Sequence, residues 1–140
     1  MTDKVEFELV SPEKLLFAQP VDLVVIPGGE GDFGVLPGHA PFIATVRPGV
    51  VAVYRDGAIT DRLFVAGGFA EVNETGVTVL AENAMPVSEI DGAKVEEEIR
   101  ALQEDLADAK DDKESAEVQV RLTVAQAKQE AVNSAAATSH

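Results

Sequence analysis

Hydrophobic and polar residues alternate along the first part of the chain in a pattern typical of half-buried strands. Val5, Phe7 and Leu9 alternate with Glu6 and Glu8, so that every second side chain can face a core. Further short apolar runs, each followed by turn residues or by another run, span 21–26, 42–46, 50–54, 59–65, 69–72 and 77–81. Short strands with turn signals about every ten residues predict a sandwich or barrel that ends near residue 85.

Two of the turns between these runs have specific chemistry. Asp56-Gly57 favours a tight hairpin between 50–54 and 59–65. The pair Gly67-Gly68 precedes the run 69–72, and we interpret it as a bend or bulge and not as a binding site.

From Glu89 onward the hydrophobic period changes to that of a helix. Val95, Ile99, Leu102 and Leu106 recur at steps of four, three and four, which places them on one helical face. The polar stretch 110–113 then interrupts the pattern, and Asp111 with Glu114 could cap a second helix. An antiparallel hairpin of two helices is the preferred interpretation. The alternative is one continuous helix of about 45 residues, because the interruption contains no glycine or proline.

The second helical segment carries two neighbouring apolar stripes of mostly small residues. One stripe is Val118, Leu122, Ala125 and Val132, and the other is Val120, Val124, Ala127 and Ala131. Folding as a hairpin would bury both faces. The polar tail 133–140 is expected to fray.

A glycine- and proline-rich stretch, PGGEGDFGVLPGHAP, spans 27–41 and separates two apolar runs. We expect a long loop of fixed geometry here, because proline fixes φ and glycine permits positive φ. Phe33, Val35 and Leu36 would then lie at or near the surface. An ordinary long turn between strands is the alternative. If the loop has a function, we expect contact with another protein.

Composition limits the function classes. The 140 residues carry a net charge of −14, which opposes binding to nucleic acid and to anionic lipid, and no apolar run approaches a membrane span. The N-terminus does not resemble a signal peptide. Without cysteine there are no disulfides or thiolate metal sites, and no metal site is expected. His39 and His140 are the only histidines, and no Gly-x-Ser-x-Gly motif supports a catalytic serine. An interaction protein without catalytic residues is therefore predicted.

Several motifs together resemble the epsilon subunit of F-type ATP synthase, of the bacterial type. They are GxxGDFGVLPGHAP ending at Pro41, VAGGFAEV at 65–72, VTVLAENA at 77–84 and the terminal pair of helical segments. The resemblance implies an α+β fold, with a β-sandwich of about ten strands over 1–85 and an antiparallel two-helix hairpin over 86–140.

The resemblance also implies a function. The protein would be a non-catalytic rotor subunit that binds the gamma subunit and the c-ring, with the alpha–beta catalytic head as a further candidate partner. It would lie on the cytoplasmic face of the bacterial inner membrane, without inserting into lipid. The residues that match the family's c-ring contact are Glu30, Asp32, Gly34 and His39.

The helical segment departs from the family's nucleotide motif, Ile/Leu-Asp-x-x-Arg-Ala. Here Ile90 and Asp91 are followed by Lys94 and Val95 in place of arginine and alanine. Lysine lacks the planar fork of arginine. Nearby bases that could form a vestigial nucleotide site are Arg100 and Arg121. We therefore expect no cofactor, ATP binding that is weak or absent, and weak regulation of hydrolysis. The alternative is a nucleotide-responsive module that inhibits hydrolysis through opening of the hairpin.

Overall fold

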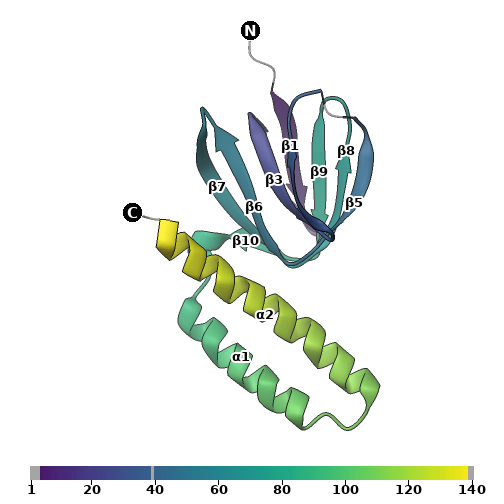
Figure 1. Ribbon diagram of the computed structural model, residues 1–140, viewed down its shortest axis with the longest axis vertical. Helices are drawn as coiled ribbons and strands as arrows, with labels where there is room; N and C mark the ends of the chain where they lie inside the picture. Colours follow the sequence, from purple (N-terminus) through teal and green to yellow (C-terminus); the bar gives the residue numbers. More distant parts are fainter. Residues whose placement is uncertain (1–3, 39, 139–140) are drawn as a thin grey trace. The chain divides into compact units, whose positions relative to one another are not determined.

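The computed structural model describes residues 4–38 and 40–138, with side chains up to residue 134. The protein divides into two compact units, Met1–Pro86 and Val87–His140. The first unit is built of strands and the second of helices, as Figure 1 shows.

The strand unit is one ten-stranded sheet that curls over to form a sandwich (Figure 1). Its strands are β1 (Val5–Val10), β2 (Leu15–Val21), β3 (Leu23–Gly28), β4 (Gly31–Val35), β5 (Phe42–Val46), β6 (Gly49–Arg55), β7 (Ala58–Val65), β8 (Gly68–Val72), β9 (Gly76–Ala81) and β10 (Ala84–Pro86). They are ordered β10-β7-β6-β3-β5-β8-β9-β1-β2, and β4 pairs only with β3. The pairing of β1 with β9 is parallel and the others are antiparallel. The predicted sandwich of about ten strands is confirmed.

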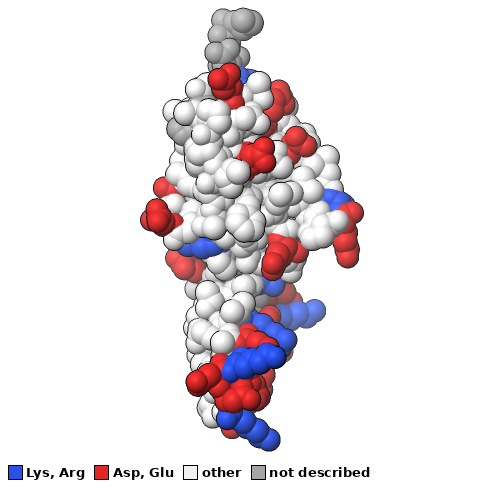
Figure 2. Space-filling view, turned by 90° about the vertical axis from the view of Figure 1, so that its right-hand side faces the viewer, with Lys and Arg blue, Asp and Glu red and all other residues white. Residues whose placement is uncertain are grey.

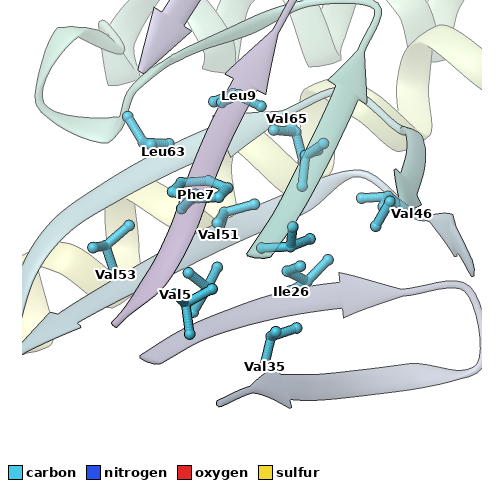
Figure 3. Packing of buried hydrophobic residues seen from close by; sticks show 14 of the residues in the cluster. Val5, Phe7, Leu9, Ile26, Val35, Val46, Val51, Val53, Leu63 and Val65 are labelled. Carbon is cyan, nitrogen blue, oxygen red and sulfur yellow. The ribbon is translucent and has the colours of Figure 1, made fainter. Parts of the chain in front are cut away.

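The core follows the alternation in the sequence. Val5, Phe7 and Leu9 on β1 are buried, whereas Glu6 and Glu8 face solvent. Figure 3 shows these three side chains in one cluster with Val51, Val65 and Ile26 from other strands. Burial of each such side chain contributes about 1.5–3 kcal/mol, so this apolar cluster is the main stabilising element of the unit.

Three strands are absent from the sequence-based prediction. β2 is an edge strand that contains Pro20 and buries only Val21, so its pattern hardly alternates. β10 has only three residues. β4 lies inside 27–41, so the prediction of one long loop is wrong for 27–35, which forms the end of β3, a turn at Gly29-Glu30 and all of β4. The described residues among 36–41 form no strand. Val35 is buried, contrary to its expected place at the surface.

The two turns singled out in the sequence are confirmed. Asp56 and Gly57 have φ of 53° and 80° and join β6 to β7 in a tight hairpin. Gly67, with φ of 116°, forms the bend before β8. A Cβ on the adjacent Gly68 would lie 1.9 Å from the carbonyl oxygen of Leu80, so glycine is required where β8 approaches β9.

Side chains tie the edge strand β2 and the segment after it to the β6–β7 turn. Arg55 donates a hydrogen bond to Gln19, and its guanidinium lies 6.0 Å from the ring centroid of Phe17. The Asp22 carboxylate accepts hydrogen bonds from the Lys4 ammonium and from the backbone N–H of Asp56, the latter at 2.6 Å. The bonds from Lys4 and Asp56 lower the pKa of Asp22 below its ordinary value.

The second unit begins with the short 3₁₀ helix η1 (Val87–Glu89) and continues with α1 (Gly92–Ala107) and α2 (Asp112–Thr138). The two α-helices lie side by side and antiparallel (Figure 1), so the alternative of one continuous helix is wrong. Leu102 on α1 packs with Val118, Leu122 and Ala125 on α2.

Local capping explains the break between the helices without glycine. The Oδ1 atom of Asp111 accepts a hydrogen bond from the backbone N–H of Glu114 at 2.7 Å. The Glu114 carboxylate in turn accepts one from the backbone N–H of Lys110 at 3.3 Å. The first bond satisfies an N–H group that the start of a helix leaves unpaired, and the second ties the preceding residue to the first turn, so both favour a new helix at this point.

The two apolar stripes of α2 differ in burial. The first stripe has Val118, Leu122 and Ala125 buried. In the second stripe Ala131 is buried, whereas Val120 is 65% exposed. The expectation that the hairpin buries both faces is therefore only half right, because Val120 on the second stripe keeps an exposed apolar side chain.

Candidate protein-contact sites

The turn between β3 and β4 is the part of 27–41 with the most constrained geometry. Gly28 pairs with Gly31 across the hairpin, and Glu30 lies exposed at the turn between them. A Cβ on Gly28 would lie 2.6 Å from the Gly31 carbonyl oxygen, and one on Gly29 would lie 2.4 Å from Thr45 Oγ1. Gly28 therefore lets the two strands of the hairpin lie close together, and Gly29 lets the turn pack closely against β5.

Arg47, just after β5, holds the base of this hairpin. Its Nη1 atom donates to the Gly28 carbonyl oxygen at 2.6 Å, and its Nη2 atom donates to Asp32 Oδ1 at 2.5 Å. Its backbone N–H donates to the Pro27 carbonyl oxygen at 2.8 Å. The turn is also fixed by the Gly29 N–H, which donates to the Thr45 carbonyl oxygen at 2.9 Å. The hairpin is thus rigidly attached although its turn is exposed.

The four residues expected at the c-ring contact can be placed only in part. Glu30, Asp32 and Gly34 are exposed on the turn and on β4, so the structure brings them together on one hairpin. His39 lies outside the described residues. A shallow open hollow of about 550 Å³ lies between the hairpin and β5, and its lining includes Glu30, Asp32 and Ile43.

A second surface is absent from the sequence-based prediction. Ile43 on β5, Phe69 on β8 and Leu80 on β9 are 73%, 56% and 52% exposed. Phe69 lies directly opposite Leu80 in the sheet register, and Ile43 lies opposite Glu71 on the other side of β8. We call these three residues the outer apolar face. The same alternation that buries Ala70 and Val79 puts Phe69 and Leu80 on the outer side, and that signal was available in the sequence.

The outer apolar face adjoins a groove of about 400 Å³ lined by Phe69, Leu80 and the β1–β2 turn residues Ser11 and Pro12. Exposed apolar residues scattered singly are ordinary, but large side chains on neighbouring strands form a patch. Such a patch beside a groove is typical of a protein contact surface.

No hydrogen bond or ion pair between their side chains links the five candidate nucleotide-site residues within the described part of the protein. Asp91 is the N-cap of α1, and its Oδ1 atom accepts from the backbone N–H groups of Ala93 and Lys94 at 3.1 and 3.3 Å. Ile90 is half-buried, and its N–H donates to the Val87 carbonyl oxygen. Lys94, Arg100 and Arg121 are exposed. Among the described residues, none of these three bases forms an ion pair with an acidic side chain.

Charge does not mark either unit as a binder of polyanions. Residues 1–85 hold five basic and 12 acidic side chains, and residues 86–140 hold six and 13. On the face shown in Figure 2, acidic residues of the sandwich stand apart on a largely uncharged surface, and both signs are interspersed over the helices. Within residues 4–38 and 40–138, no cluster of potential ligands could hold a metal ion, and no helix is long and apolar enough to cross a membrane.

Comparison with known proteins agrees with the fold of both units. The family model described as ATP synthase, Delta/Epsilon chain, beta-sandwich domain matches residues 4–87. The family model for the C-terminal domain of the ATP synthase epsilon chain matches residues 91–140. The ATP synthase epsilon chain of Rhodospirillum centenum is 55% identical over 133 residues, covering 91% of each protein. That of Paramagnetospirillum magneticum is 52% identical over 132 residues, covering 94% of this protein and 99% of the relative.

Solved structures give the same result. A chain of the Euglena gracilis mitochondrial ATP synthase, in an assembly of OSCP, F1 and c-ring, superposes with a TM-score of 0.80 at 26% identity, covering 92% of this protein and 81% of that one. A chain of the Tetrahymena thermophila enzyme, from a structure of the central stalk and c-ring, shares the fold with a TM-score of 0.64 at 11% identity, covering 94% and 98%.

The β-sandwich, the pair of helices and the matches to known proteins together define the class of this protein, a non-catalytic stalk subunit of a membrane-associated ATP synthase. The protein belongs to the epsilon-subunit family of F-type ATP synthase.

Proposed function

We propose that this protein is a central-stalk subunit of the rotor, which links the gamma subunit to the c-ring and so couples proton flow to ATP synthesis. The observation that carries the proposal is the β3–β4 hairpin, whose turn is exposed but held by Arg47 and by the Gly29–Thr45 backbone bond. A contact that transmits torque must not yield under load, and a hairpin fixed at several points to a packed sandwich meets that need.

The c-ring is the proposed partner of the hairpin. Glu30, Asp32, Gly34 and His39 match the family residues at this contact, and the first three lie on the exposed side of one hairpin. Polar loops of a ring suit a polar hairpin surface, and acidic residues at the turn favour basic groups on the ring. Exposed ion pairs of this kind contribute about 0–1 kcal/mol each, so they set orientation more than affinity.

The gamma subunit is the proposed partner of the outer apolar face. Phe69 and Leu80 are large apolar side chains opposite each other on adjacent strands, and aromatic residues are enriched in the centres of protein interfaces. Removal of such side chains from water is the main source of binding free energy in a stable contact. The adjoining groove supplies a concave surface for a partner side chain.

The helical unit is proposed to regulate ATP hydrolysis only weakly and to bind ATP weakly or not at all. Asp91 is engaged as a helix cap, and Lys94 can offer phosphate only a point charge. The alpha–beta catalytic head remains a candidate partner of this unit, but acidic surfaces on both sides would oppose the contact.

The proposed location is the cytoplasmic face of the bacterial inner membrane, through the c-ring and gamma. Bacterial relatives support this location, and the net charge of −14 supports attachment through protein partners, since an acidic surface is repelled by anionic lipid.

Reconstitution tests the proposal. The full-length protein is added to inverted membrane vesicles of its own organism whose ATP synthase has been depleted of this subunit, and ATP-driven proton pumping is measured with ATP hydrolysis. We expect the protein to bind and to raise the protons pumped per ATP hydrolysed. Binding without any recovery of pumping would contradict a coupling role.

A further inference from the structure

Arg47 contacts both strands of the β3–β4 hairpin and bridges them. Its two terminal nitrogens reach the Gly28 carbonyl oxygen on β3 and the Asp32 carboxylate on β4 at 2.6 and 2.5 Å. A planar guanidinium can hold two acceptors in fixed directions, whereas a lysine ammonium is a single point charge. The side chain therefore fixes the spacing of the two strands beside the turn.

The same contact assigns different roles to the two acidic residues of the hairpin. Asp32 pairs with Arg47, so its charge is largely compensated within the protein. Glu30 lies two residues earlier at the exposed turn, and among the described residues no ion pair or hydrogen bond reaches its carboxylate. A cationic group approaching the turn would meet one uncompensated carboxylate and not two.

We propose that Arg47 is a positioning residue for the ring contact: by holding Gly28 and Asp32 it leaves Glu30 as the carboxylate that meets a cationic group of the partner. The inference rests on the proposed contact between the hairpin and the c-ring. Arg47 itself is 44% exposed at its side chain and faces the protein's own hairpin. It acts through the hairpin and not by touching the partner.

Four variants separate these roles. Arg47→Met keeps the aliphatic stem but removes the charge and all side-chain donors, and the backbone bond from residue 47 to Pro27 remains. Arg47→Lys restores the charge without the fork. Asp32→Asn keeps an oxygen that can accept from Arg47 but removes the negative charge, and Glu30→Gln removes the charge at the turn.

The binding probe is proteoliposomes that contain the c-ring and gamma of the same organism, and the full-length protein is titrated at several salt concentrations. We expect Arg47→Met to lower affinity about two- to five-fold, the range of an exposed pair, with faster amide exchange at residues 29–34. Its salt dependence should steepen, because Asp32 becomes a second uncompensated carboxylate. The double variant Arg47→Met with Asp32→Asn should regain the salt dependence of the original protein but not its affinity. The single variant Arg47→Lys should bind more tightly than Arg47→Met and less tightly than the original protein.

The other two variants fix the role of the acids. Glu30→Gln should lose most of the salt dependence, whereas Asp32→Asn should lose less affinity than Glu30→Gln and keep most of the salt dependence. An Arg47→Met variant with unchanged affinity and salt dependence, or a Glu30→Gln variant with full salt dependence, would overturn the inference. If the original protein does not bind the proteoliposomes with c-ring and gamma more tightly than it binds soluble gamma alone, the proposed ring contact fails instead, and the two failures are distinct.

Discussion

The carboxylate of Asp91 lies 3.3 Å from the backbone nitrogen of Lys94, so two residues of the candidate nucleotide motif are joined to each other as a helix cap. The same oxygen also accepts from Ala93. At the N-terminus of a helix such a carboxylate satisfies unpaired N–H groups and interacts favourably with the helix dipole. Its presence in the sequence thus has a structural cause that requires no nucleotide.

Loss of this cap should destabilise the helical unit. We expect Asp91→Ala to lower its free energy of unfolding by about 0.5–2 kcal/mol and to speed amide exchange at residues 93 and 94. Asp91→Asn is the matched control, because asparagine caps as well and lacks only the charge. Equal exchange rates in all three proteins would show that the cap is unimportant.

Titration of the full-length protein with ATP in a calorimeter should give little or no heat. The Asp91 carboxylate is engaged as the cap of α1, and lysine binds phosphate without the bidentate geometry of arginine. Lys94→Arg should raise any measurable affinity, while Lys113→Arg on the first turn of α2 controls for the added guanidinium. Micromolar affinity in the original protein would contradict this expectation.

Sequence patterns predicted the sandwich well because its core obeys simple alternation. Phe7 and Leu9 face inward and Glu8 faces outward, so one face of β1 could be assigned directly. The helix break was also predictable, since Asp111 and Glu114 have the spacing of a capping box. In these places local chemistry and tertiary packing favour the same structure.

Prediction failed where long-range contacts decide the structure. β4 contains two glycines and an aspartate, and it is a strand only because it pairs with β3 and is held by Arg47, which is 15 residues from Asp32 in the sequence. Neither partner can be identified from local propensity. The outer apolar face was missed for a different reason. The run 77–81 is apolar apart from Thr78, so its composition does not mark Leu80 as the side chain that faces outward, although alternation along β9 puts it there.

Stability should depend on pH through Asp22. Hydrogen bonds from Lys4 and from the Asp56 N–H hold the pKa of Asp22 below its ordinary value in the folded protein. A depressed folded-state pKa means that the contribution is present above the unfolded value of about 3.9 and is lost as the pH falls through the folded value. In urea titrations, Asp22→Asn should therefore be less stable than the original protein at pH 7, and the difference should shrink below about pH 4.

Glu8→Gln on the exposed side of β1 is the control for a lost negative charge. The difference in the free energy of unfolding between Glu8→Gln and the original protein should not shrink below about pH 4 as that of Asp22→Asn does. A stability difference for Asp22→Asn that stays constant from pH 7 to pH 3 would show that packing, and not ionisation, explains the effect.

The strand unit should fold without the helices. All six phenylalanines lie in residues 1–85, and the core cluster of the sandwich draws its buried members from the strands alone. We expect residues 1–86 to unfold cooperatively on heating and to bind gamma. A variant ending at residue 83 is the comparison, because it lacks β10 and so leaves the edge of β7 at residues 63–65 unpaired. It should melt at a lower temperature. A gradual, non-cooperative melt of residues 1–86 would refute the independence of the unit.

Deletion of residues 87–140 should change ATP hydrolysis little, and the reason is electrostatic. To inhibit hydrolysis the helices would have to enter the alpha–beta head, where the family resemblance implies acidic residues. Residues 86–140 carry 13 acidic and six basic side chains, so like charges would meet. When such like-charge contacts are removed from water, they oppose binding by several kcal/mol. The apolar residues that could offset this pack within the hairpin, where Leu102 contacts Val118, Leu122 and Ala125. Hydrolysis by the enzyme reconstituted with residues 1–86 should therefore stay within about two-fold of that with the full-length protein, a change of about 0.4 kcal/mol in the activation free energy.

A matched full-length variant with Glu96, Glu97 and Glu98 changed to glutamine tests the cause, because relief of repulsion should increase inhibition. A large rise in hydrolysis on deletion, with no effect of the three substitutions, would show that specific contacts outweigh net charge.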